Sequence, residues 1–138
     1  VVGGAERDVL PRRRHVLFVA FPVEGESDHL PPLVLKRGDA DVVVSTNGIH
    51  GPRAVLYFGG NAEDVSQVVA PLVRAFPQRA VYAMHYRGCG GSTGAPSEEA
   101  LVADARRLFE QVARKHPGVV VVGRSLGSGI AIQVAAAP

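Results

Sequence analysis

Apolar residues along this chain form two kinds of pattern, short continuous runs and longer stretches in which they recur every three or four positions. The short runs are rich in Val and Leu and are bounded by Gly, Pro or charged residues, which predicts strands. These runs cover residues 15–21, 33–35, 41–45, 54–58, 80–86 and 119–122. The last run has four successive Val residues, which is typical of a strand buried on both faces.

Three longer stretches have the apolar spacing of helices. Residues 62–76 form the first, although Pro71 must kink this helix or begin a second segment. Ser97 is suited to cap the second, because two Glu residues then fall in its first turn, and Pro117 followed by Gly ends it. Its predicted buried stripe is Leu101, Ala105, Leu108, Phe109 and Val112. The Ala-rich run 130–137 predicts the third helix.

From Arg53 onward, strands and helices alternate strictly along the chain. Such alternation predicts an α/β fold, a three-layer sandwich whose mostly parallel sheet lies between helices. A length of 138 residues suits one domain with a sizeable core. We expect residues 1–13 to form an irregular arm, and residues 14–138 to form the domain.

Composition excludes several classes of protein. A hydrophobic content of 46% excludes a disordered chain, and a net charge of +2 gives no reason to expect a nucleic-acid partner. The single cysteine, Cys89, excludes an internal disulfide and a Cys-based zinc cluster, which suits a cytoplasmic location. No two His share a helix turn, so we expect no metal, and no glycine motif indicates a dinucleotide cofactor.

Membrane association is also not expected, because no apolar stretch approaches the length of a span. Three successive Arg residues at 12–14 precede the short run 16–21, which faintly resembles a signal peptide or a membrane-surface patch. Three charges on an N-terminal arm are more commonly just solvated.

The strand at 119–122 is followed at once by a G-x-S-x-G motif, Gly123 to Gly127, and then by the third helix. A strand, a sharp turn with a central Ser and a helix constitute a nucleophile elbow. The turn is tight enough that side chains at the two glycine positions would collide. The strained backbone presents the Ser hydroxyl near the positive end of the helix. We therefore predict that Ser125 is a nucleophile.

The same motif occurs a second time, from Gly90 to Gly94. Its Ser92 lies in a Gly-rich stretch in which no helix begins, and Pro96 follows closely. This context favours a flexible loop serine without a catalytic role.

These motifs resemble those of the α/β-hydrolase superfamily, in particular the branch of small serine hydrolases described as serine-aminopeptidase-like or acyl-thioesterase-like. The resemblance rests on Y-F-G-G-N-A-E-D at 57–64, Y-R-G-C-G-G-S-T-G at 86–94, P-S-E at 96–98 and the elbow, and covers residues 32–138. It implies an eight-stranded, mostly parallel sheet in which strand 54–58 lies beside strand 119–122. This chain would hold the N-terminal portion of that domain, truncated after the elbow helix.

The resemblance also implies an oxyanion hole formed by the backbone N–H groups of Asn61 and Leu126. Each such donor typically lowers the barrier by about 3 kcal/mol. Leu126 also suits this role because first-turn N–H groups of a helix have no internal partner. The alternative for Gly59 to Asn61 is an ordinary turn in which Asn caps a helix. Family members often have His where this chain has Gly59, a change expected to loosen the support of the loop.

The triad of this superfamily runs Ser, Asp or Glu, then His, yet neither an acid nor a His follows Ser125. His85 is the best-placed upstream His, but it would lie two strands away, at roughly 10 Å. We therefore expect a serine hydrolase of ester, thioester or amide bonds that is weak or inactive as this chain alone. The alternative is a non-catalytic interaction module with a vestigial elbow. We also expect an unpaired Val-rich edge at 119–122 that favours self-association.

Overall fold

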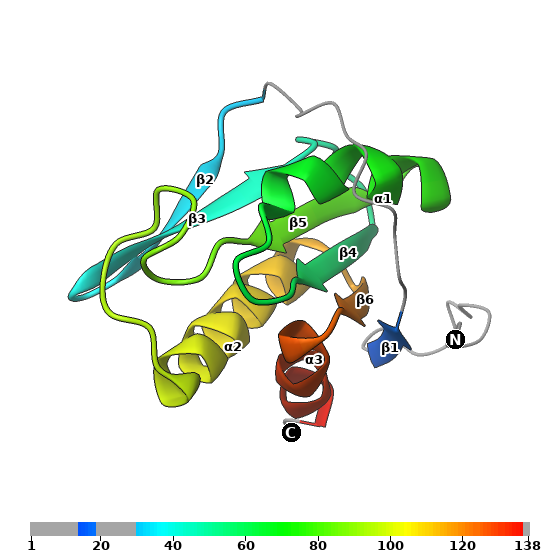
Figure 1. Ribbon diagram of the computed structural model, residues 1–138. Helices are drawn as coiled ribbons and strands as arrows, with labels where there is room; N and C mark the ends of the chain where they lie inside the picture. The colour runs from blue at the N-terminus through cyan, green and yellow to red at the C-terminus, as the bar shows by residue number, and fades with distance from the viewer. Residues whose placement is uncertain (1–13, 19–29, 137–138) are drawn as a thin grey trace.

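The computed structural model describes residues 14–18 and 30–136, so the predicted arm over residues 1–13 lies outside the described part. Within that part, six strands form one sheet (Figure 1). They are β1 (Arg14–Phe18), β2 (Leu33–Arg37), β3 (Ala40–Thr46), β4 (Arg53–Phe58), β5 (Ala80–Met84) and β6 (Gly118–Gly123). Their order across the sheet is β1-β6-β4-β5-β3-β2.

Most of the sheet is parallel. Strands β1, β6, β4 and β5 pair in parallel, whereas β3 pairs antiparallel with β5 and β2 pairs antiparallel with β3. The predicted neighbour relation is confirmed, because β4 lies directly beside β6, with Phe58 opposite Gly123 at their carboxyl ends. The carboxyl ends of both strands therefore meet at one edge of the sheet. The segment Gly59 to Asn61 follows β4 there, and the predicted elbow follows β6.

The prediction of an unpaired Val-rich edge is wrong. Strand β1 pairs in parallel with β6 along its length, with Val16 opposite Val121. The outer strands of the described sheet are β1 and β2 instead. The apolar pattern predicted a strand over 15–21, which overlaps β1, but could not say which neighbour it would pair with, since that depends on contacts distant in sequence.

Helices cover both faces of the sheet and make the predicted three-layer sandwich (Figure 1). The short 3₁₀-helix η1 (Val65–Val68) and helix α1 (Val69–Ala75) lie on one face. Helices α2 (Glu98–Lys115) and α3 (Leu126–Ala136) lie on the other. The predicted fold class, a mostly parallel sheet of α/β-hydrolase type, is confirmed.

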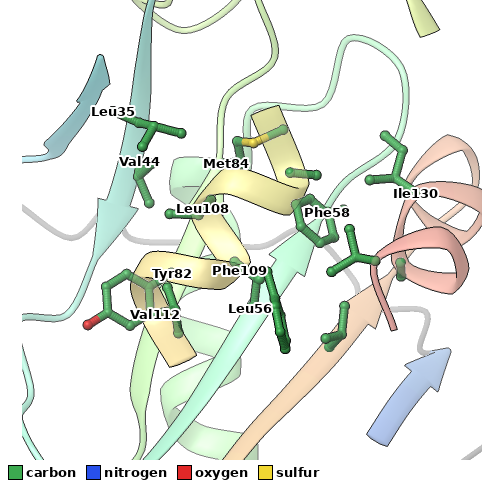
Figure 2. Packing of buried hydrophobic residues seen from close by; sticks show 14 of the residues in the cluster. Leu35, Val44, Leu56, Phe58, Tyr82, Met84, Leu108, Phe109, Val112 and Ile130 are labelled. Atoms are coloured by element: carbon green, nitrogen blue, oxygen red, sulfur yellow. The ribbon is translucent and has the colours of Figure 1, made fainter. Parts of the chain in front are cut away.

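Two hydrophobic clusters fill the spaces between the layers. The larger one joins α2 and α3 to the sheet, and Figure 2 shows Leu108 and Phe109 of α2 and Ile130 of α3 gathered around Leu56 and Phe58 of β4. The smaller cluster joins η1 and α1 to the opposite face through Val65, Val68, Val69 and Leu72, packed against Val55, Tyr57 and Val81 among others. Both faces of β4 and β6 are thus covered, as the continuous apolar runs predict.

Helix α2 follows the prediction closely. The Ser97 hydroxyl accepts a hydrogen bond of 3.0 Å from the Ala100 N–H, which satisfies one of the free donors of the first turn. The whole predicted stripe is buried.

The helix predicted over residues 62–76 is shorter than expected. Asn61 and Ala62 form a turn, the Asp64 carboxylate caps η1, and α1 begins only at Val69. Pro71 therefore lies in the first turn of α1, where a missing N–H costs no hydrogen bond. The proline begins a second segment, which was one of the two predicted outcomes.

Candidate active site

Ser125 occupies the turn between β6 and α3. Its backbone φ is +54°, a left-handed conformation that a residue with a Cβ rarely adopts. The residue is exposed, and its hydroxyl makes no hydrogen bond with any described residue. The hydroxyl thus stands free at the carboxyl end of the sheet, next to the N-terminus of α3.

The two glycines of the motif are required by close packing. A Cβ on Gly123 would lie 2.5 Å from the Gly127 carbonyl oxygen. A Cβ on Gly127 would lie 1.9 Å from the Phe58 carbonyl oxygen, at the end of β4. The two ends of the elbow therefore pack closely against each other and against the end of β4, which leaves no room for a side chain at either glycine, as the sequence pattern predicts.

The loop that follows β4 lies directly beside Ser125. A Cβ on Gly60 would be 3.5 Å from the Ser125 Cβ. Asn61 and Leu126 are both exposed, and neither N–H donates to another group in the described part of the chain. The three residues predicted from sequence therefore lie in the loop after β4 and at the turn that opens α3, and the N–H groups of Asn61 and Leu126 have no acceptor among the described residues.

Glu63 links the loop after β4 to the elbow and is not among the site residues predicted from the sequence. Its carboxylate accepts hydrogen bonds from the Tyr57 hydroxyl at 2.7 Å, the Gly60 N–H at 2.9 Å and Arg124 Nη1 at 3.3 Å. The Glu63 N–H in turn donates to the Gly60 carbonyl at 3.3 Å. A Glu three positions after a loop residue, bonded back to that residue's N–H, is the spacing of a capping box, which could have revealed it.

Gly59 has a different consequence from the one predicted. A Cβ there would lie 2.8 Å from Val65 Cγ1 and 2.9 Å from Glu63 Cδ. The absence of a side chain at this position therefore makes room for the Glu63 carboxyl group, which holds the loop. Whether glycine loosens the loop relative to a histidine stays a prediction, but Glu63 supplies a support that the prediction did not include.

Two buried tyrosines border the loop. The Tyr86 hydroxyl donates to the Gly59 carbonyl at 2.7 Å, and Tyr86 and Tyr57 belong to the two different hydrophobic clusters. Burial raises the pKa of Tyr57, with a further contribution from its hydrogen bond to Glu63. Burial also raises the pKa of Tyr86. Both tyrosines therefore stay protonated and act as hydrogen-bond donors at neutral pH.

None of the histidines whose side chains are described contacts Ser125. His85 follows β5, and its Nε2 lies 2.8 Å from the Ser45 hydroxyl. His116 is bonded to the Tyr82 hydroxyl at 2.7 Å and to the Gly51 carbonyl at 2.6 Å, near the amino end of β4. His50 is exposed. The sequence-based placement of His85 and His116 away from Ser125 agrees with these bonds.

Ser92 is anchored rather than flexible. Its hydroxyl donates to the His85 carbonyl at 2.8 Å and accepts from the Val43 N–H at 2.7 Å, and the residue is buried. The serine fastens the loop after β5 to the neighbouring strand β3. The motif at 90–94 is thus structural, although the expectation of a flexible loop is wrong.

Within residues 14–18 and 30–136, no group of three or more His, Cys, Asp or Glu converges in a way that could hold a metal ion. Over the same residues, each helix is too short or too polar to cross a membrane.

A parallel sheet between helices, with a strained serine in the turn after β6, defines the class of the α/β hydrolases. Residues 50–138 match the family described as "Serine aminopeptidase, S33", which is more than half of the chain. The chain therefore belongs to this family, within the α/β-hydrolase superfamily.

Individual relatives agree with this assignment. The chain is 31% identical over 106 residues to protein bem46 of Schizosaccharomyces pombe, a match that covers 71% of this chain and 35% of that protein. It is 37% identical over 144 residues to an uncharacterized protein of Mycobacterium tuberculosis, covering 90% of this chain and 49% of the relative. The chain thus spans half or less of the length of these curated relatives.

Solved structures support the fold. An alpha-beta serine hydrolase homologue from Coxiella burnetii superposes with a TM-score of 0.59 at 18% sequence identity. The superposition covers 76% of this chain and 56% of the other.

Proposed function

We propose that this chain contributes the nucleophile and the oxyanion hole of a serine hydrolase that acts on ester, thioester or amide bonds. The observation that carries the proposal is the left-handed backbone of Ser125, which is exposed and has no hydrogen-bond partner among the described residues. The turn also has no room for a Cβ at the glycines two positions before and two positions after the serine. Strain of this kind costs about 1–3 kcal/mol and persists mainly at functional sites. Membership of a hydrolase-fold family supports the same conclusion.

In the proposed reaction, Ser125 Oγ attacks the carbonyl carbon of the substrate and gives up its proton to a base. The carbonyl oxygen becomes an oxyanion, which accepts hydrogen bonds from the Asn61 and Leu126 N–H groups. Collapse of this intermediate expels the alcohol, thiol or amine with a proton, and water then releases the acyl group from Ser125. Both donors are available, because neither is bonded to another described group.

The base is the part of the machinery that the described residues do not supply. His85 and His116 are bonded elsewhere, and no His or acidic residue follows Ser125 in the sequence. A serine hydroxyl without a base is a poor nucleophile at neutral pH. We therefore expect slow acylation of the 138-residue chain, supported by the oxyanion hole alone.

Covalent labelling with a fluorophosphonate probe tests the assignment. We expect the wild-type chain to be labelled slowly at a single site, with Ser125→Ala reducing labelling to background, at least a hundredfold. Ser92→Ala is the matched control, because it removes the serine of the other G-x-S-x-G motif and should leave labelling within about twofold. Circular dichroism checks that each variant is folded.

Two results would contradict the proposal. Labelling that survives Ser125→Ala would place the nucleophile elsewhere. A folded wild-type chain that is never labelled would favour the alternative, an interaction module that retains the elbow without its chemistry.

A further inference from the structure

Glu63 receives hydrogen bonds from three segments that meet at the candidate site. Tyr57 belongs to β4, Gly60 to the loop after it, and Arg124 to the elbow. The Glu63 side chain is only 7% exposed, so the carboxylate is held among these donors rather than hydrated. A buried carboxylate is stable when its lone pairs are satisfied in this way.

The position of Gly60 shows how near this carboxylate is to the nucleophile. A Cβ on Gly60 would lie 3.5 Å from Ser125 Cβ and 3.6 Å from Glu63 Oε1, so both groups lie within 4 Å of one point. The Gly60 N–H donates to Glu63. The next N–H, that of Asn61, has no acceptor among the described residues. The Glu63 bond thus fixes the N–H that directly precedes the candidate donor in the chain.

The loop also needs to be held, because it contains a strained residue. Ala62 has a φ of +59°, in the left-handed region. The reciprocal bonds between Gly60 and Glu63 close the turn around Ala62. Without them, the loop would be free to relax to an ordinary backbone conformation, which would redirect the Asn61 N–H.

Arg124 extends this support to the elbow. Its guanidinium pairs with Glu63 at 3.3 Å, and its backbone N–H donates to the Phe58 carbonyl at 3.0 Å. The residue before the nucleophile is thereby tied to the loop through its side chain and to β4 through its backbone. Arg124 also balances the Glu63 charge, which would otherwise repel an oxyanion formed so close by.

We infer that Glu63 is a positioning residue that sets the Asn61 N–H relative to Ser125, by bonding both the oxyanion loop and the elbow. This role rests on the proposed function. Because misplacement of a catalytic group by about 1 Å can cost about a hundredfold in rate, loss of Glu63 should slow the attack of Ser125 Oγ on the phosphorus of the probe, which releases fluoride, without changing how the probe is bound.

The first test measures the fluorophosphonate labelling rate against probe concentration, which separates the maximal rate constant, kinact, from the half-saturating concentration, KI. We expect Glu63→Ala to lower kinact by about tenfold to a hundredfold and to change KI by less than about threefold. Glu63→Gln keeps an acceptor for the Gly60 N–H and should recover most of the lost rate.

Two control variants separate positioning from general effects. Leu108→Ala removes a buried side chain from α2, which covers the face of the sheet opposite η1 and α1. This variant reports the effect of lost stability alone. Glu110→Ala removes an exposed carboxylate and reports the effect of charge. Both should leave kinact within about twofold when the protein is folded. An equal loss of kinact in Leu108→Ala and Glu63→Ala would overturn the inference.

A second test does not depend on activity. Backbone ¹⁵N–{¹H} NOE values report the order of the loop, and we expect Glu63→Ala to lower them for Gly60, Asn61 and Ala62 while α2 stays unchanged. Unaltered NOE values would overturn the inference. If the wild-type chain is never labelled, the proposed function fails, and these values still decide whether Glu63 holds the loop.

Discussion

The elbow can form only because residue 127 is a glycine, whose side chain is a hydrogen atom rather than a methyl group. A Cβ at this position would lie 1.9 Å from the Phe58 carbonyl oxygen and 2.4 Å from its carbon. These atoms are backbone atoms of a central strand, so they cannot move aside as a flexible side chain could. Through Gly127, helix α3 and the turn that holds Ser125 pack directly against the end of β4.

We therefore expect Gly127→Ala to lower the free energy of unfolding by about 3 kcal/mol, because the added methyl group forces the elbow away from β4. Urea denaturation followed by circular dichroism measures the change. Gly129→Ala is the matched control on the same helix, because a Cβ there would meet nothing within 4 Å. It should raise stability by about 0.5–1 kcal/mol, as Ala favours a helix over Gly. Equal effects of the two substitutions would contradict this account.

At the scale of the elements, His85 and Ser92 join the loop after β5 to β3. The His85 N–H donates to the Val43 carbonyl at 2.9 Å, and its ring is bonded to Ser45 of the same strand. Ser92 bonds to both Val43 and His85. This polar cluster continues the pairing of β3 with β5 beyond the last residue of β5.

Burial makes this cluster sensitive to pH. It lowers the pKa of His85, and the negative charge of Asp64 opposes this change only in part. The unfolded chain, with an ordinary His pKa of about 6.5, then binds a proton that the folded chain does not. Stability is therefore full above this value and falls as the pH drops through and below about 6.5.

We expect urea denaturation of the wild-type chain to show lower stability at pH 5.5 than at pH 7.5, and His85→Gln to reduce that difference. Gln removes the titrating group but keeps a polar partner for Ser45. His50→Gln, at an exposed histidine, should leave the difference unchanged. A pH dependence that is the same in wild type and His85→Gln would assign the effect to other groups.

At the scale of the whole molecule, Asp104 connects parts of the fold that are distant in sequence. This residue of α2 is fully buried and accepts hydrogen bonds from Arg37 of β2 at 3.0 Å and from Arg87 after β5 at 2.8 and 3.0 Å. The pKa of Arg87 is raised, chiefly by its hydrogen bond to Asp104. One carboxylate thus ties the helical layer to the antiparallel side of the sheet.

Removal of this carboxylate charge should destabilise the fold strongly, because two arginines lose their shared buried carboxylate and Arg87 keeps only the exposed Asp39, at 3.4 Å. We expect Asp104→Asn to lower the free energy of unfolding by about 3 kcal/mol, measured by urea denaturation. Glu110→Gln, which breaks an exposed ion pair of 3.3 Å with Arg107, should cost less than about 1 kcal/mol. Similar losses in both variants would contradict the distinction between buried and exposed pairs.

The sequence by itself determined the elements and the fold class. Continuous Val-rich runs predicted strands covered on both faces, and the caps of α2 were visible in Ser97 and its following acids. Ser125 was also identifiable, because a strand, two glycines and a helix around a serine form a local pattern. These features depend on neighbours along the chain, which the sequence displays directly.

Only the tertiary structure decided which distant groups meet. It paired β1 with the strand predicted to be an open edge, and it brought Glu63 to Arg124, 61 positions away. Strand order and side-chain hydrogen bonds depend on residues up to about a hundred positions apart, which leave no periodic signal in the chain. The proposed nucleophile could therefore be found from the sequence, whereas the sequence showed at most the spacing of Glu63 from Gly60 and not the contact of Glu63 with Arg124.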